Sequence, residues 1–103
     1  MAPEELAELH HFQTLVHSFL EGRSTADGFT GDYFQAFGDT QRIWGKEIHG
    51  VLEDMFFALE GYQEDPALRD SGDLDEAALR RAAEQAATKL GAILSREEAE
   101  GRP

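Results

Sequence analysis

The chain has 103 residues, of which 41% are hydrophobic, and this length suffices for one domain with a single core. Its 9 Lys and Arg residues against 21 Asp and Glu residues give a formal net charge of −12 at pH 7. This charge disfavours direct binding to nucleic acid or to an anionic membrane, and it attracts basic proteins. The absence of cysteine excludes disulfides, thiolate metal sites and thiol nucleophiles.

The N-terminal segment begins with acidic residues and has no long apolar run. It resembles neither a signal peptide nor a membrane span, so the cytoplasm is the expected compartment. Pro3 suits the first position of a helix, and acids follow it in the first turn. Gly22 is expected to end this first helix. The apolar residues at helical spacing are Leu6, Leu9, Phe12, Val16, Phe19 and Leu20.

A short second helix is expected after Ser24, because Ser24 and Asp27 resemble a capping box. Gly28 and Gly31 oppose it, since each costs about 1 kcal/mol relative to Ala in a helix interior. The sequence therefore leaves open whether this helix is continuous up to the break expected at Gly38. Its buried face is formed by Phe29, Tyr33, Phe34 and Phe37.

The third helix has the clearest pattern. Its apolar positions are Trp44, Ile48, Val51, Leu52, Met55, Phe56 and Leu59. Lys46, His49, Glu53 and Glu60 occupy the opposite face, and Gly61 lies near the end.

A short turn and a fourth helix complete the chain. Asp65 can cap a helical turn that begins at Pro66 and that Gly72 closes. Asp73 with Glu76 resembles a second capping box, which predicts a helix from about Leu74 to Ser95. Its buried residues are expected to be Leu79, Ala82, Ala83, Ala86, Leu90 and Ile93. Residues 97–103 are expected to form a disordered tail.

Four amphipathic helices with short connections predict an all-α fold, an antiparallel four-helix bundle. No stretch shows the alternation of a half-buried strand. Residues 1–96 are expected to form one domain. The predicted core contains Phe12, Val16, Phe19, Trp44, Ile48, Leu52, Met55, Phe56, Leu79 and Ala83.

The stretch from Glu53 to Leu79 carries a crowd of carboxylates with Arg69 as its only base. Glu60 and Glu64 form a like-charge pair near the end of the third helix, where the helix dipole also disfavours anions. Residues that are locally unfavourable for folding are commonly found at functional sites. We therefore predict a binding surface for a positively charged partner. Its candidate residues are Glu53, Asp54, Glu60, Tyr62, Glu64, Asp65, Asp70, Asp73 and Asp75.

A plainer interpretation of this stretch is a solvated face. Asp65, Asp73 and Asp75 can all serve as helix caps, and charge runs are commonly solvated. The acids outnumber the caps, however, which favours the binding surface. Tyr62 lies within the acidic turn, where an exposed aromatic ring could anchor a partner.

Catalysis and metal binding have little support. His10, His11 and His17 resemble metal ligands, but a ferritin-like site needs Glu-x-x-His pairs on two helices, and the sequence does not supply two such pairs. The serines lie in no nucleophile motif, and no glycine loop for phosphate is present. We expect no enzyme activity, no metal site and no cofactor.

Two runs of residues resemble the colicin D immunity protein family. One extends from Phe56 to Leu79 and includes Tyr62, Asp65-Pro66, Leu68-Arg69, Asp73, Asp75, Glu76 and Leu79. The other includes Phe19, Leu20, Gly22, Ala26, Phe29, Tyr33 and Phe37. Together they cover about residues 12 to 95. The chain departs from the family in the glycine content of the second helix and in Gln63, which replaces a cysteine.

The resemblance implies a four-helix bundle that binds and blocks a cognate nuclease toxin of the tRNase type. In this family an acidic surface covers the basic active site of the toxin in place of the RNA backbone. The charge of the chain agrees independently with that role. Two alternatives remain open: an antitoxin or nuclease inhibitor from an unrelated system, and a small metal-binding or carboxylate enzyme of the bundle type. A monomer is favoured.

Overall fold

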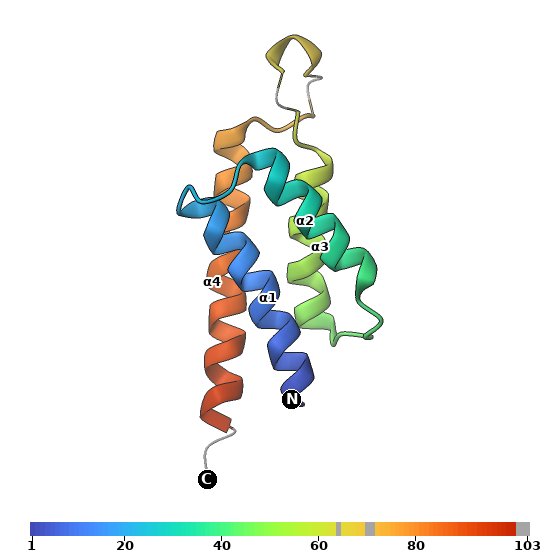
Figure 1. The fold of residues 1–103 in the computed structure, drawn as a ribbon, viewed down its shortest axis with the longest axis vertical. Helices are drawn as coiled ribbons and strands as arrows, with labels where there is room; N and C mark the ends of the chain where they lie inside the picture. Colours follow the sequence, from blue (N-terminus) through green and yellow to red (C-terminus); the bar gives the residue numbers. More distant parts are fainter. Residues whose placement is uncertain (64, 70–71, 101–103) are drawn as a thin grey trace.

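The computed structural model describes residues 1–63, 65–69 and 72–100. It contains the helices α1 (Pro3–Leu20), α2 (Ala26–Asp39), α3 (Lys46–Glu60) and α4 (Glu76–Glu100), with a 3₁₀ turn, η1 (Pro66–Leu68), between the last two. Successive helices run in opposite directions, so that both termini lie at one end and the α3–α4 connection projects from the other (Figure 1). The prediction of an all-α, antiparallel four-helix bundle is confirmed. No helix within the described residues is long and apolar enough to cross a membrane.

Each helix packs against two neighbours. α1 packs against α2 and α4, and α3 packs against the same two helices. The core between them is aromatic at the α1–α2 contact, where Phe19 stacks on Phe29 with ring centroids 4.9 Å apart and Phe12 lies 5.3 Å from Tyr33. Small residues on α4, Ala83 and Ala86, allow the other helices to approach closely.

Most of the predicted core residues are buried. These are Phe12, Val16, Phe19, Trp44, Leu52, Met55, Leu79 and Ala83. Ile48 and Phe56 are only half-buried and pack against the edge of the core. Phe56 contributes there to a small aromatic cluster, with its ring 4.6 Å from Phe37 and 5.0 Å from Phe34.

Tyr33 is a polar residue in the centre of the bundle, with no exposed surface. Its hydroxyl donates a hydrogen bond of 2.8 Å to the backbone carbonyl of Leu52, which joins α2 to the inner face of α3. Burial raises the pKa of the Tyr33 phenol well above its ordinary value, because the charged phenolate would lose its hydration.

The first two helices begin and end close to the expected positions. α1 is followed by Gly22, whose φ of 79° is a conformation that glycine adopts without strain. The prediction that Ser24 caps α2 is wrong by one residue, since the Thr25 hydroxyl accepts the hydrogen bond from the Gly28 backbone at 3.0 Å. α2 is continuous through Gly31 and Gly38, because its aromatic face is buried and offsets the low helix propensity of glycine.

The last two helices differ from prediction at their ends. α3 begins at Lys46, so Trp44 is buried from the preceding loop and not from a helix. The cap of α4 is Asp75 and not Asp73, since the Asp75 carboxylate accepts from the Ala78 backbone at 2.8 Å. α4 also continues beyond Ser95 to Glu100, so residues 97–100 are helical where a disordered tail was expected. Residues 101–103 lie outside the described residues.

Candidate partner-binding surface

The outward side of α3 carries carboxylates around an aromatic ring. Glu53, Phe57 and Glu60 are spaced at i, i+4 and i+7, which places them on one face, and Asp54 lies three residues before Phe57. Asp54, Phe57 and Glu60 are exposed, and Glu53 is half-buried. We call these four residues the α3 face. They are held by a helix whose other side is packed into the core.

Two carboxylates of the α3 face are not engaged by other residues that the structure describes. Asp54 and Glu60 make no hydrogen bond or ion pair with any residue that the structure describes. Glu53, in contrast, lies 2.8 Å from the ring nitrogen of His49 on the preceding turn. Glu60 is the last residue of α3, where the helix dipole disfavours an anion. The conflict predicted between Glu60 and the helix dipole is therefore present in the fold, whereas the predicted like-charge pair with Glu64 is not tested, because Glu64 lies outside the described residues. Asp54 and Glu60 remain available to a partner.

The acids after α3 are arranged differently. We call the described residues between α3 and α4, namely 61–63, 65–69 and 72–75, the finger. Its base is closed by backbone hydrogen bonds from Gln63 to the Leu74 carbonyl (3.0 Å) and from Leu74 to the Gly61 carbonyl (2.7 Å). The Arg69 side chain donates to the Gln63 carbonyl at 2.8 Å and ties the tip of the finger back to this base.

Within the finger, Asp65 and Asp75 serve the fold. Asp65 accepts a hydrogen bond of 2.9 Å from the Ala67 backbone and caps η1, as predicted. Asp75 caps α4, and Asp73 is half-buried. Carboxylates that accept backbone N–H groups have part of their capacity satisfied internally. These acids are therefore less available to a partner than Asp54 and Glu60.

Tyr62 is half-buried, which makes it a poorer anchor than an exposed ring would be. It pairs with Leu74 in an isolated β-bridge at the base of the finger. Its ring also lines a cavity of about 470 Å³ with Thr25, Ala26, Asp27, Arg69 and Glu76. The candidates Glu64 and Asp70 lie outside the described residues.

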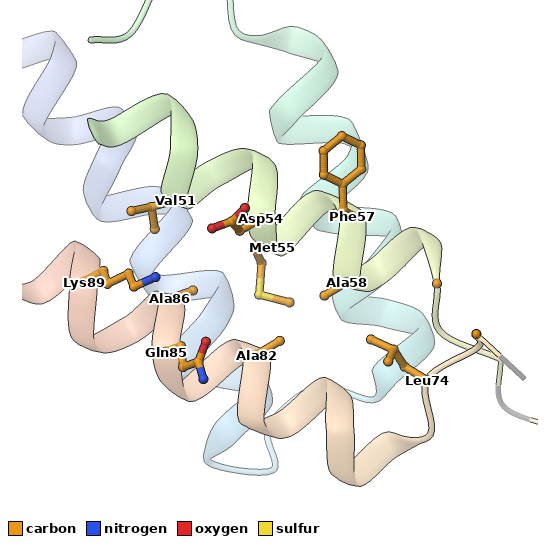
Figure 2. Close-up of a pocket in the computed structure, with 12 residues that line it drawn as sticks. Val51, Asp54, Met55, Phe57, Ala58, Leu74, Ala82, Gln85, Ala86 and Lys89 are labelled. Carbon is orange, nitrogen blue, oxygen red and sulfur yellow. The ribbon is translucent and has the colours of Figure 1, made fainter. Parts of the chain in front are cut away.

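A groove of about 430 Å³ lies between α3 and α4, next to the α3 face. Figure 2 shows its α3 wall, which carries Asp54 and Phe57, and its α4 wall, which carries Gln85 and Lys89. The interior between these walls is largely apolar. It is lined by Val51, Met55, Ala58, Leu74, Ala82 and Ala86.

Phe57 was absent from the residues selected by sequence. It falls outside the apolar stripe of the third helix and lies among polar positions, and its side chain is 56% exposed. A large aromatic residue on the charged side of an amphipathic helix is the signal that could have identified it.

The histidines do not gather at one place. His10 lies 3.7 Å from Glu98 on α4, and His49 pairs with Glu53 on α3. Among the residues that the structure describes, no group of three or more His, Asp or Glu side chains is placed to hold a metal ion.

The fold is an all-helical bundle that displays exposed carboxylates and an exposed aromatic ring on α3. The chain belongs to the family of bacterial self-protective colicin-like immunity proteins, whose family model matches residues 8–90. It is therefore a bacteriocin immunity protein, a class of inhibitor that binds a cognate colicin-like toxin. No curated protein and no solved structure matches the chain significantly.

Proposed function

We propose that this immunity protein inhibits a colicin D-like tRNase by covering its basic active site with an acidic surface. The exposed carboxylates of Asp54 and Glu60 are the observation that carries this proposal. A ribonuclease needs a positively charged groove for its RNA substrate, and carboxylates fixed on a rigid helix can occupy the positions of RNA phosphates.

Rigidity supports this role. The acids of the α3 face are displayed by a helix whose inner residues Leu52, Met55 and Leu59 are at most 2% exposed. Little conformational entropy is therefore lost when the surface meets its partner, and this favours tight binding. The sequence that follows α3 adds further acids, and we propose that they contribute to the same negative surface; these are Glu64, Asp65, Asp70, Asp73 and Asp75.

The net charge supports both the partner and the oligomeric state. A chain with a charge of −12 attracts a basic toxin domain and repels a second copy of itself, so we propose that the chain acts as a monomer. A tRNase acts where tRNA is found, so we propose that protection takes place in the cytoplasm.

The test is reconstitution with the toxin encoded by the neighbouring gene. Its nuclease domain should co-purify with this chain, and tRNA cleavage by that domain should stop when the chain is added in equimolar amount. Association should be steered, with rates approaching about 10⁸–10⁹ M⁻¹s⁻¹ at low salt and falling steeply as salt is added. Cleavage that continues in the presence of excess chain would contradict the proposal. A rate of association that salt leaves unchanged would remove electrostatic steering from it.

A further inference from the structure

We infer that Phe57 and the α3–α4 groove form the apolar centre of the docking surface, and that their occupant is a basic segment of the toxin. This segment would place a large apolar side chain in the groove and a cationic side chain against Phe57 and its neighbouring carboxylates. The inference rests on the proposed function and adds to it a specific anchor and the chemistry of the segment that binds there.

The position of Phe57 is supported by the fold although its ring is exposed. The ring meets Phe56 edge-on, with centroids 6.0 Å apart, and Phe56 stacks on Phe37 at 4.6 Å. The exposed ring therefore stands on a packed aromatic cluster. Binding energy at protein interfaces is concentrated in such preformed aromatic positions.

The groove provides a place for an apolar side chain from a partner. Its interior is formed by Met55 and Ala58 on α3 and by Ala82 and Ala86 on α4, and the short alanine side chains leave it open. Asp54, Gln85 and Lys89 line its walls and give it a polar border. An apolar centre inside a polar rim is the usual composition of a protein-binding hot spot.

The charges around Phe57 favour a basic occupant over a second copy of the chain. Glu53, Asp54 and Glu60 lie four residues before, three residues before and three residues after Phe57, which makes all three acidic residues its neighbours on the helix surface. A second copy would bring the same carboxylates against these ones. An Arg guanidinium can stack on the aromatic face and donate hydrogen bonds to a carboxylate at the same time.

The test compares exposed apolar residues at two ends of the molecule. Calorimetry measures the dissociation constant between this chain and the nuclease domain of the toxin encoded next to it. Four forms of the chain are compared: the unaltered chain, Phe57→Ala, Phe57→Trp and Ile43→Ala. Ile43 is a matched control because it is a fully exposed apolar residue in the α2–α3 loop, far from the groove. Thermal midpoints are recorded for all variants.

We expect Phe57→Ala to raise the dissociation constant about 30-fold or more, as loss of a hot-spot residue does. Phe57→Trp should keep the affinity within about threefold, because it retains an aromatic face for the cation. Ile43→Ala should also change it by less than about threefold, as most surface positions outside a hot spot do. Normal binding by Phe57→Ala would overturn the inference while the proposed function stands. Failure of the unaltered chain to bind would instead overturn the proposed function, and the inference with it.

A second variant tests the groove without altering Phe57. Gln85 is exposed on the α4 wall, so Gln85→Trp should fill the groove and weaken binding by about tenfold or more, whereas Gln35→Trp on exposed α2 surface should not. Normal binding by Gln85→Trp would overturn the groove as the docking site. Sedimentation of the chain alone tests the other occupant, because a dimer that Phe57→Ala dissociates would overturn the inference in favour of a second copy.

Discussion

The two sides of α3 differ sharply in burial and in charge. On the inner side, Leu52 and Met55 are 1% exposed and hold the helix in the core. On the outer side, Phe57 is 56% exposed and lies three residues from Asp54 and from Glu60, which make no hydrogen bond or ion pair with the described residues. The same 15-residue helix therefore carries buried residues that hold it in the core and exposed residues whose substitution we expect to affect stability little. Substitutions on the two sides should separate folding from binding.

The finger provides a second contrast, between carboxylates that the backbone engages and carboxylates that it does not. Asp75 and Asp65 accept hydrogen bonds from the backbone, whereas Asp54 and Glu60 on α3 make none with the described residues. Negative charge alone therefore does not identify an acid that binds a partner. The local backbone decides, because a carboxylate just before a helix is used as a cap and one on a helix exterior is not.

The largest effect should come from charge reversal on the outer side of α3. Glu60→Lys should weaken toxin binding by about 2–5 kcal/mol or more, since it removes a carboxylate from a cation on the toxin and adds repulsion. The free energy of unfolding should stay equal or rise by a few tenths of a kcal/mol, because a cation suits a helix C-terminus. Calorimetric affinity and urea unfolding measure the two quantities. Normal binding by this variant would place the site away from the α3 face.

A large effect of the opposite kind is expected on the inner side. Leu52→Ala should lower the free energy of unfolding by about 2–5 kcal/mol, because it leaves a cavity in a packed core. Urea unfolding measures this change, and the affinity of the fraction that remains folded should be close to that of the unaltered chain. A loss below about 1 kcal/mol would show that Leu52 is not at a closely packed position.

A smaller effect should distinguish the capping acids from those of the α3 face. Asp75→Ala removes the cap of α4 and should cost about 1 kcal/mol of stability. Asp54→Ala is the matched control and should change stability by less than about 0.5 kcal/mol, as surface substitutions usually do. Thermal unfolding of the two variants gives the comparison. Equal losses would mean that Asp54 has a structural role.

An effect of similar size at neutral pH concerns the hydrogen bond from Tyr33 to α3. Tyr33→Phe should cost about 0.5–1.5 kcal/mol near pH 7, the usual net value of one hydrogen bond. The pKa of Tyr33 is raised in the folded state from its ordinary value of 10.0, so above about pH 10 the unfolded chain loses a proton that the folded chain keeps. In this range Tyr33 should lower the stability of the unaltered chain by up to about 1.4 kcal/mol per pH unit, and Tyr33→Phe should lack this contribution. Urea unfolding across this range measures the difference, and a constant difference would show that Tyr33 can ionise within the fold.

Local sequence determined much of this protein. The spacing of apolar residues predicted four helices and most of the core, because a helix that buries one side must repeat its apolar residues every three to four positions. Pro3 and Asp65-Pro66 marked the start of a helix and of a turn for equally local reasons. The acidic stretch could be identified from the sequence for the same reason, since the sequence gives both the charges and their positions relative to a helix end.

Only the tertiary structure decided which of these residues are exposed and which are used within the fold. The continuity of α2 through its glycines, the burial of Trp44 from a loop and the half-buried position of Tyr62 depend on contacts between distant segments. Propensity cannot predict these contacts, because burial against a neighbouring helix outweighs it. The groove beside Phe57 exists only where Ala82 and Ala86 of α4 meet α3. A surface shared by two helices is decided by their packing, which neither helix specifies alone.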